Sequence, residues 1–378
     1  MSKFLIACGG TGGHLSPGIA LAEALLARGH TVTLFISHKE VDRRLVEKYP
    51  HLTAQRVASA PFEFRPNALA RFVVKQSAGL FFSWRFLRQH RPDAIIGFGG
   101  FTNAGVVVAG RALGIPVALH EANRIPGRAI RTLSPLARRL YLPPGVRMPG
   151  IRGVMVRHTG LPVRNEIARQ LRDDARRQLG ADPGQRLLVV LGGSQGSSNL
   201  NHWVEENLAA FALAGVQVFC VTGLGKGRVG LEELRGRNGE TVRAWFEPFS
   251  DRVGVLLSAA DLVLTRAGAG TLAELVRCET PAILIPYPFA ADNHQAANAR
   301  YFEQQGGGIV VAEQALGSLT QEVLDVIFND WLLSKFRTNL HRMSRENCID
   351  TIVHDLEDLA VDPHPPGPLR ASTALILL

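Results

Sequence analysis

Residues 187–197 read Leu-Leu-Val-Val-Leu-Gly-Gly-Ser-Gln-Gly-Ser. The first five are branched and apolar, which is typical of a buried parallel strand. The Gly pair and the polar residues after it predict a tight turn that leads into a helix near Ser198. Such a turn favours anions, because glycine allows close approach of the main chain and the N–H groups of a helix N-terminus attract negative charge. The stretch therefore predicts a phosphate-facing loop.

The same arrangement occurs at the start of the chain. Residues 3–8 are a predicted strand, residues 9–14 (Gly-Gly-Thr-Gly-Gly-His) a turn, and residues 17–28 a helix. Two strand–turn–helix units of this kind predict an α/β protein with two doubly wound domains of parallel strands. Ligands of such sheets bind beyond the carboxyl ends of the strands. We therefore expect the two sheets to face a central cleft.

Composition narrows the classes of partner. A chain of 378 residues predicts two or three domains, and its formal net charge of +9 favours a polyanionic partner. That partner could be nucleic acid, a phosphorylated substrate or an anionic lipid surface. The sequence has no zinc-finger spacing, helix-turn-helix signal or basic motif interleaved with aromatic residues, so we expect no nucleic acid. The four cysteines form no CxxC pair, which fits a reducing compartment.

Alternating apolar runs and helical patterns define the domains. In the first domain we expect strands at 31–36, 51–58, 93–97, 116–120, 138–142 and 153–159, after the one at 3–8. In the second we expect 187–191, 216–222, 241–246, 261–265 and 282–286, with helices between them. Glycine and proline at 160–162, followed by a predicted helix at 166–179, place a boundary there. We expect domains at 1–163 and 164–345, and a helix end with a Pro-rich tail at 346–378.

One segment of the first domain mixes aromatic and basic side chains. Residues 61–91 contain seven phenylalanines or tryptophans from Phe62 to Phe86, together with Arg65, Arg71, Lys75, Arg85, Arg88 and Arg91. The segment is either a core helix with a solvated basic side or a membrane-surface patch, in which basic residues meet lipid phosphates. We find no signal peptide and no apolar run long enough to span a bilayer, so we expect a cytoplasmic protein, soluble or peripheral to a membrane.

Several motifs together resemble those of the MurG family of bacterial glycosyltransferases. They occupy residues 9–14 with 17–18, 99–101, 120–123, 160–164, 192–196, 266–274 and 292–299. Their order along the chain is that of the family, and they cover roughly residues 3–345. The resemblance implies a GT-B fold of two Rossmann-like domains. It also implies an inverting transfer of N-acetylglucosamine from UDP-N-acetylglucosamine to the 4-hydroxyl of undecaprenyl-pyrophosphoryl-N-acetylmuramyl-pentapeptide, the step from lipid I to lipid II in peptidoglycan synthesis.

The resemblance implies a set of donor-binding residues in the second domain. They are Arg164, Ser194, Phe249, Ala269, Gly270, Thr271, Leu272, Ala273, Glu274, Gln295 and Asn298. Glu274 suits the two ribose hydroxyls because an ionised carboxylate only accepts hydrogen bonds. Gln295 and Asn298 are three residues apart, so they share a helix face and can reach the sugar hydroxyls. Without the resemblance, Glu274, Gln295 and Asn298 read as ordinary polar helix residues, and Arg164 as an interdomain salt bridge.

The first domain is expected to supply the catalytic groups. Thr11, Gly12, Gly13 and Asn123 are expected to cover the donor's sugar and pyrophosphate and to receive the acceptor. His14 is the best candidate for the general base because its ordinary pKa, about 6.5, suits proton removal near neutral pH. A helix-capping or phosphate-contacting role for His14 is the alternative. Glu121 is either a competing base or the group that orients the acceptor, and His120 is expected in the core.

The sequence also departs from the family pattern. Leu161, Ala122, His294 and Phe101 stand where the family usually has Asn, Gln, Gln and Tyr. Residues 267–270 carry fewer hydroxyls and fewer large apolar side chains than is usual. These departures concern substrate contacts rather than the fold.

No Asp-x-Asp motif occurs in the chain, so we expect no metal site and no cofactor, and the charge of the departing UDP would be met by helix N-termini and Arg164. The implied partners are UDP-N-acetylglucosamine, undecaprenyl-linked lipid I, an anionic membrane surface and, through roles in cell shape and division, other cell-wall or division proteins. The implied place is the cytoplasmic face of the inner membrane. A diacylglycerol glycosyltransferase, a non-catalytic UDP-sugar-binding protein and, more weakly, a nucleotide-sugar epimerase remain as alternatives.

Overall fold

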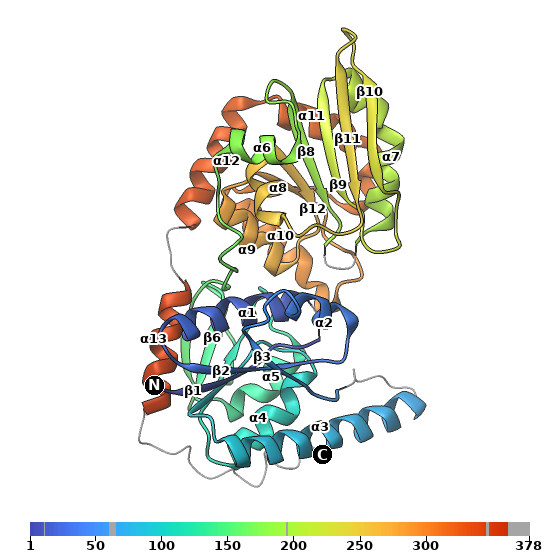
Figure 1. The fold of residues 1–378 in the computed structure, drawn as a ribbon. Helices are drawn as coiled ribbons and strands as arrows, with labels where there is room; N and C mark the ends of the chain where they lie inside the picture. Colours follow the sequence, from blue (N-terminus) through green and yellow to red (C-terminus); the bar gives the residue numbers. More distant parts are fainter. Residues whose placement is uncertain (11, 60–65, 194–195, 345–347, 362–378) are drawn as a thin grey trace. The chain divides into compact units, whose positions relative to one another are not determined.

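The computed structural model describes residues 1–10, 12–59, 66–193, 196–344 and 348–361. Within these ranges the chain forms two compact units. Unit 1 contains residues 1–164 and the described residues from 348 on, and unit 2 contains residues 165–344. Both are doubly wound α/β units with a sheet between helical layers (Figure 1). The predicted fold class is confirmed for each unit, while the cleft between them stays a prediction.

Unit 1 has a fully parallel sheet. Its strands, in the order β3-β2-β1-β4-β5-β6-β7, are β1 (Lys3–Ala7), β2 (Thr31–Ile36), β3 (Thr53–Arg56), β4 (Ala94–Gly97), β5 (Val117–His120), β6 (Arg139–Leu142) and β7 (Met155–His158). Its helices are α1 (Gly12–Ala27), α2 (Glu40–Val46), α3 (Pro66–His90), α4 (Thr102–Ala112), α5 (Arg128–Leu133), η1 (Ser134–Leu136) and α13 (Cys348–Val361). β1, β4 and β5 are buried throughout their described lengths apart from Lys3, as expected for parallel strands covered on both faces.

Two apolar cores flank this sheet. One joins α1 to α13, with Leu21, Leu25, Ile352 and Leu356 among its buried members. The other joins α3, α4 and α5 to the opposite face of the sheet. The last described helix therefore belongs to unit 1, although it follows all of unit 2 in the sequence (Figure 1). The sequence predicted this helix without indicating which sheet it covers.

Unit 2 repeats the design with one difference. Its strands, in the order β10-β11-β9-β8-β12-β13-β14, are β8 (Arg186–Leu191), β9 (Val216–Val221), β10 (Gly230–Arg235), β11 (Thr241–Glu247), β12 (Leu262–Thr265), β13 (Ala282–Leu284) and β14 (Gly308–Val310). Its helices are α6 (Arg172–Leu179), α7 (Ser198–Leu213), α8 (Val253–Ala259), α9 (Ala269–Cys278), η2 (Ala291–Asn293), α10 (His294–Gln304), η3 (Glu313–Ser318), α11 (Leu319–Ile327) and α12 (Asp330–Met343). β10 pairs antiparallel with β11, and the other pairs are parallel.

Three local predictions were wrong. A helix was expected between β9 and β11, but the chain there forms β10, whose exposed edge carries Glu232 and Glu233 in place of a second apolar face. The helix expected at 166–179 begins only at Arg172. Residues 165–167 form a turn, residues 168–171 have no regular structure, and the Gln170 N–H donates to Ser258 Oγ at 3.0 Å. α1 begins at Gly12 rather than at Pro17, which places His14 in the first turn of the helix.

Candidate functional site

Most candidate residues of unit 1 lie at the carboxyl ends of β1 and β5, and the loop after β4 lies at the same edge of the sheet. Gly12, Gly13 and His14 belong to the first turn of α1, and Glu121 and Asn123 to the loop after β5. β1 and β4 are neighbours, and the strand order reverses between them, so their loops flank the switch point where doubly wound sheets bind ligands. In the described residues, the loops after β1, β4 and β5 carry residues 8–10, 98–101 and 121–127. Thr11 lies outside the described residues.

The loop after β1 is shaped by close packing. A Cβ on Gly9 would lie 2.2 Å from the main-chain nitrogen of Ser37, so no larger residue fits there. The buried carboxylate of Asp42 accepts hydrogen bonds from the Gly10 N–H at 2.8 Å and from the Ser37 hydroxyl at 2.6 Å. Lys39 Nζ donates to the Gly10 carbonyl at 2.6 Å. Asp42 therefore positions the loop, a role that the sequence analysis missed because a lone Asp in a helix gives no signal.

His14 lies against the loop after β4. A Cβ built on Gly100 would be 3.3 Å from His14 Nδ1, and one built on Gly99 would be 3.4 Å from Nε2. Both glycines have positive φ, +92° at Gly99 and +78° at Gly100, a backbone conformation that other residues rarely adopt. A side chain at either position would therefore press against the half-buried imidazole.

Glu121 organises the loop after β5. Its Oε1 accepts from the N–H of Asn123 at 2.8 Å and from that residue's side-chain amide at 3.1 Å. Its Oε2 accepts from the Gly127 N–H at 2.7 Å, and the side chain is buried. These contacts favour an orienting role for Glu121 over that of a competing base. They also fix Asn123, which the sequence analysis placed at the donor.

His120 is a core residue, as expected. Its ring is buried, stacks on Phe98 at 5.1 Å and forms a hydrogen bond through Nε2 with the Gly160 carbonyl at 3.1 Å. Burial lowers the pKa of His120 to about 4, only partly offset by that hydrogen bond. The ring is therefore neutral near pH 7, with Nε2 carrying the proton that Gly160 accepts.

Arg164 is the last residue of the first segment of unit 1. Its Nη1 donates to the hydroxyl of Tyr49 at 3.1 Å, which holds the guanidinium within this unit. The structure therefore gives Arg164 a partner near the boundary between the two units. Its expected contact with the donor stays a prediction.

The candidate residues of unit 2 lie at the equivalent edge of its sheet. The strand order reverses between β8 and β12, and the loops after these strands lead into α7 and α9. Ser197 caps α7 by accepting a hydrogen bond from the Leu200 N–H at 3.4 Å, close to the predicted start. Gly193 and Gly196 have positive φ, and a Cβ on Gly196 would lie 2.5 Å from the Thr222 carbonyl oxygen. Ser194 lies outside the described residues.

Arg266 links three of these loops. Its guanidinium donates to Ser197 Oγ at 2.9 Å, to the Ile285 carbonyl at 3.2 Å and to Glu313 at 2.7 Å. The Arg266 side chain is buried, and its hydrogen bond lowers the pKa of Glu313. The sequence analysis quoted Arg266 within a motif but gave it no role. A charged residue directly after a buried apolar strand was the signal available, since such a charge requires partners.

The N-terminus of α9 is open to approach. Gly268 is its N-cap residue and has no side chain to cap the helix, so the first N–H groups point into the loop region. A Cβ on Gly268 or Gly270 would meet no atom within 4 Å. Glu274 lies one turn after Gly270 on the same helix face and is half-buried. The expected binding of the donor by Ala269, Thr271, Leu272, Ala273 and Glu274 stays a prediction, favoured by this open helix N-terminus beside a carboxylate.

α10 presents the two predicted sugar-binding amides. Gln295 Oε1 accepts from the Tyr287 N–H at 2.9 Å, which leaves its NH₂ group as the end that can donate to a ligand. Asn298 is buried and donates to the Ala267 carbonyl at 3.2 Å, so it also ties α10 to the loop before α9. His294 forms a 2.7 Å hydrogen bond through Nδ1 with the Ala291 carbonyl. The exposed Phe249 belongs to the loop after β11, at the same edge of the sheet.

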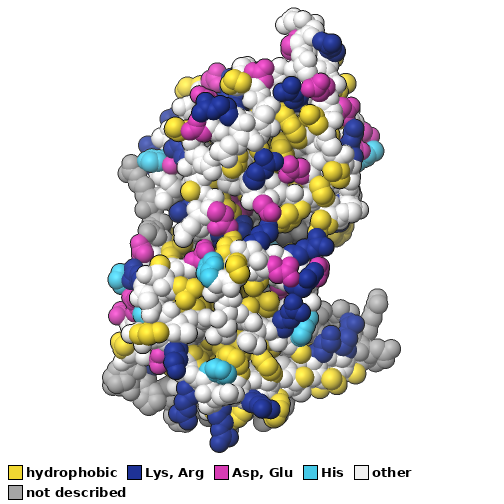
Figure 2. Space-filling view, viewed as in Figure 1, with side chains coloured by type: hydrophobic (Ala, Val, Ile, Leu, Met, Phe, Trp, Pro, Cys, Tyr) yellow, Lys and Arg dark blue, Asp and Glu magenta, His cyan; other side chains and the backbone are white. Residues whose placement is uncertain are grey.

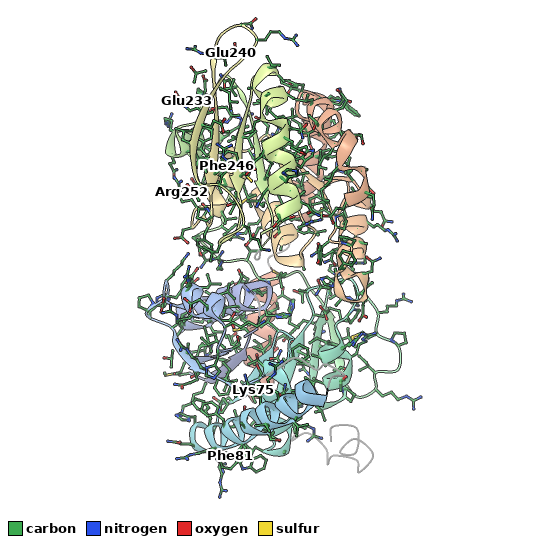
Figure 3. All side chains as sticks on the ribbon, turned by 90° about the vertical axis from the view of Figure 1, so that its right-hand side faces the viewer. Lys75, Phe81, Glu233, Glu240, Phe246 and Arg252 are labelled. Carbon is green, nitrogen blue, oxygen red and sulfur yellow. The ribbon has the colours of Figure 1, made fainter. Side chains whose placement is uncertain are left out.

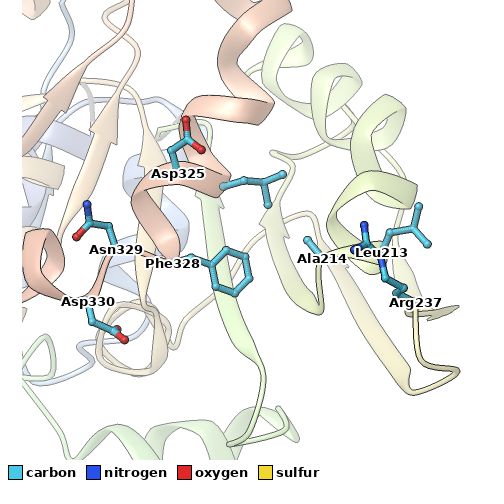
Figure 4. Close-up of a pocket in the computed structure, with 8 residues that line it drawn as sticks. Leu213, Ala214, Arg237, Asp325, Phe328, Asn329 and Asp330 are labelled. Atoms are coloured by element: carbon cyan, nitrogen blue, oxygen red, sulfur yellow. The ribbon is translucent and has the colours of Figure 1, made fainter.

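Open cavities in unit 2 lie away from these loops. One, of about 790 Å³, is lined by Leu213, Ala214, Arg237, Leu324, Asp325, Phe328, Asn329 and Asp330 (Figure 4). Leu213 ends α7 just before β9 begins, so this cavity lies at the amino ends of the strands. Among the described residues, no group of three or more His, Cys, Asp or Glu side chains is arranged to hold a metal ion.

Comparison with known proteins identifies two matching domain families. Residues 4–142 match the glycosyltransferase family 28 N-terminal domain, and residues 187–350 match the C-terminal domain of the same family. A protein of Opitutus terrae is 58% identical over the full length of both chains. It is named UDP-N-acetylglucosamine–N-acetylmuramyl-(pentapeptide) pyrophosphoryl-undecaprenol N-acetylglucosamine transferase.

A protein of the same name from Parasynechococcus marenigrum is 37% identical and covers 95% of this chain and 99% of its own. The crystal structure of Acinetobacter baumannii MurG superposes with a TM-score of 0.70 over 94% of this chain and 99% of that one. Its sequence identity is 22%, so this similarity concerns the fold.

Proposed function

Because this chain belongs to glycosyltransferase family 28, we propose that it transfers N-acetylglucosamine from UDP-N-acetylglucosamine to the 4-hydroxyl of N-acetylmuramyl-pentapeptide on undecaprenyl pyrophosphate. The observation that carries the proposal is the 58% identity, over all of both chains, to a protein named for this reaction. The chain is a UDP-N-acetylglucosamine-dependent glycosyltransferase of peptidoglycan synthesis.

Unit 2 is the proposed donor site. The pyrophosphate would meet the N-termini of α7 and α9, where unsatisfied N–H groups and glycine loops favour anions. Arg266 supports this role because its hydrogen bond to Ser197 ties the loop after β12 to the loop after β8. Glu274 would accept the ribose hydroxyls, and the NH₂ group of Gln295 would donate to the sugar. No cofactor is part of this proposal.

His14 of unit 1 is the proposed general base. In an inverting transfer, it would take the proton of the acceptor 4-hydroxyl while that oxygen bonds to the anomeric carbon. The bond from the anomeric carbon to UDP breaks in the same step, and the electron pair leaves with the pyrophosphate. The position of the imidazole beside Gly99 and Gly100 supports this role because it places the ring at the switch point of the sheet. Glu121 would keep the acceptor loop in place.

α3 is the proposed membrane-facing element. Phe82 and Phe86 pack against the buried Phe35, so part of the helix is core. Val74 and Phe81, seven residues apart on one face, are 68% and 70% exposed. Figure 2 shows hydrophobic and basic side chains along this helix, and in Figure 3 Phe81 extends from its outer side. The core reading holds for the inner face, and the membrane-surface reading is our proposal for the exposed face.

None of the described helices combines the length and apolar character needed to cross a bilayer. We propose peripheral attachment at the cytoplasmic face, through the exposed face of α3 and anionic lipid. Contacts with other cell-wall or division proteins stay an expectation from the family resemblance.

One assay separates this function from its alternatives. Purified protein would receive labelled UDP-N-acetylglucosamine with a lipid I analogue and, in parallel, UDP-glucose with diacylglycerol. We expect product in the first reaction and none in the second. Product only in the second would replace the proposal with a diacylglycerol glycosyltransferase, and donor binding without any transfer would leave a UDP-sugar-binding protein.

A further inference from the structure

A second cavity of unit 2 is rich in arginine. It measures about 620 Å³ and is lined by residues 169–172 with Leu257, Ser258, Ala260, Cys278, Glu279, Thr280 and Arg337. α8 ends just before β12 and α9 ends just before β13, so the cavity lies at the amino ends of these strands. It is therefore separate from the candidate donor loops, which lie at the carboxyl ends.

Positive charge around the cavity exceeds negative charge. Arg169, Arg172 and Arg337 line it. Arg169, Arg172 and the neighbouring Arg176 and Arg186 each form an ion pair with a carboxylate. The fully buried Asp261 binds Arg172, binds Arg176 at 2.6 Å and lies 3.5 Å from Arg186. Glu279 is shared by Arg169 and His341. Asp330 meets Arg186 on the outer side at 2.7 Å.

Arg337 is the least compensated of these cations. Its contact with the Asp261 residue is to the main-chain carbonyl, at 3.4 Å, while the carboxylate of Asp261 is taken by other arginines. Burial lowers the pKa of Arg337, and neighbouring Arg172, Arg186 and Arg169 lower it further against the attraction of Asp261. A half-buried guanidinium at a cavity wall with like charges around it is a binding group for an anion.

The rest of the cavity is suited to binding a small molecule rather than to catalysing a reaction. Its volume lies in the range of small-molecule pockets, roughly 300–1,000 Å³. Leu257, Ala260 and Cys278 contribute apolar side chains to the lining of the cavity. Burial raises the pKa of Cys278 to about 12, so this thiol stays neutral and is no nucleophile.

We propose that this cavity binds a phosphate-bearing anion, with Arg337, Arg172 and Arg169 as its ligands. The phosphate belongs either to a soluble phosphomonoester or to the headgroup of an anionic phospholipid, since both present the same oxygens to the arginines. Arg169 and Arg172 belong to the segment that enters unit 2 from unit 1, so an occupied site holds that segment to α12.

Equilibrium dialysis of the full-length protein with labelled inorganic phosphate tests the site, with saturating UDP present to occupy the donor loops. We expect saturable binding that Arg337→Gln weakens roughly tenfold or more, as for loss of a charged hydrogen bond. Arg337→Lys keeps the charge and should retain part of the affinity. Arg342→Gln, on the same helix but outside the cavity lining, removes the same charge and should bind like the wild type.

Thermal melting checks that each variant is folded. If Arg337→Gln fails to fold, Arg169→Gln replaces it, because that side chain is 57% exposed. Competition with glycerol 3-phosphate and with a short-chain phosphatidylglycerol then distinguishes the soluble from the lipid source. Equal loss of binding in Arg342→Gln and the cavity variant, or no saturable binding by the wild type, overturns the proposal.

Discussion

His14 depends on two residues that have no side chain. Gly99 and Gly100 both have a positive φ, and a Cβ on either would lie close to the imidazole. Changing Gly100 to Ala would place a methyl group 3.3 Å from Nδ1 and should displace the ring. We expect turnover to fall roughly 10- to 100-fold, as for small misplacements of a catalytic group, with UDP affinity unchanged. His14→Ala sets the full effect of losing the base, about 10²- to 10⁴-fold.

Gly114→Ala is the matched control. Its φ of +74° imposes similar backbone strain, but a Cβ there would meet no atom within 4 Å. Both glycine variants should lose similar stability in urea unfolding. We expect steady-state kinetics to show the loss of turnover for Gly100→Ala only. An equal loss in both variants, or no loss in either, would contradict a role of the His14 position in catalysis.

Glu274 makes a second residue-level prediction. Glu274→Ala should weaken UDP binding by about 10- to 100-fold, because hydrogen bonds to charged groups contribute roughly 1.5–3 kcal/mol. The loss should be smaller when 2′-deoxy-UDP is the ligand, since one of the two ribose hydroxyls that Glu274 would bind is then absent. Calorimetry with both nucleotides measures this, and an unchanged preference for UDP in the variant would remove Glu274 from the ribose site.

His120 makes unit 1 sensitive to acid. Burial lowers its pKa to about 4 in the folded state, whereas the unfolded chain binds the proton near 6.5. The unfolded state therefore holds more protons between these values, so the stability from His120 is present above pH 6.5 and is lost as pH falls toward 4. Between pH 7 and 5 the loss should reach about 2 kcal/mol. In urea unfolding, His120→Gln should show a smaller loss than the wild type, and equal slopes would contradict the assignment.

At the scale of elements, the sequence predicted most strands and helices because parallel strands between helical layers are apolar throughout. It failed where tertiary context decides. β10 reads Gly-Leu-Glu-Glu-Leu-Arg, which lacks a clear strand period, and pairing with β11 along an exposed edge determines its structure. Residues 166–171 carry a helical pattern but form no helix, and the N–H of Gln170 bonds to Ser258 of α8 instead. Arg266 and Asp42 act through partners distant in the sequence, which no local motif reveals.

α3 packs into the core through one face and is proposed to contact the membrane through the other, and the second role can be tested separately. Arg85→Glu with Arg88→Glu reverses two exposed charges, and each basic residue near an anionic surface contributes about 1 kcal/mol. We expect less sedimentation with anionic vesicles, and the same effect of salt on the wild type, while activity on a short water-soluble acceptor persists. Lys335→Glu with Arg342→Glu on α12 changes the net charge equally and should keep vesicle binding. Vesicle binding indifferent to charges and salt would leave α3 as a core helix only.

At the scale of the whole molecule, unit 1 is completed by α13. Asp355 of this helix is buried and accepts from the Tyr141 hydroxyl at 2.8 Å, with Arg139 at 3.3 Å and Arg157 at 3.4 Å. Removing one partner of a buried charge network costs about 3–5 kcal/mol. Asp355→Ala should therefore lower the unfolding midpoint of unit 1, while UDP binding by unit 2 is kept. Calorimetric scans with and without UDP measure the unfolding of unit 1 and the UDP binding of unit 2. An unshifted unfolding transition of unit 1 would show that the Asp355 contacts of α13 do not stabilise it.

The return of α13 to unit 1 also sets an order for biosynthesis. When a ribosome has released residues 1–164, the sheet of unit 1 exists but one of its faces still lacks Ile352, Val353, Leu356 and Leu359. Unit 2 is continuous in sequence and can close as soon as it emerges. Unit 1, most of which is synthesised first, is thus the unit whose core is completed last. Nascent chains stalled before residue 348 should expose an apolar surface that chaperones bind.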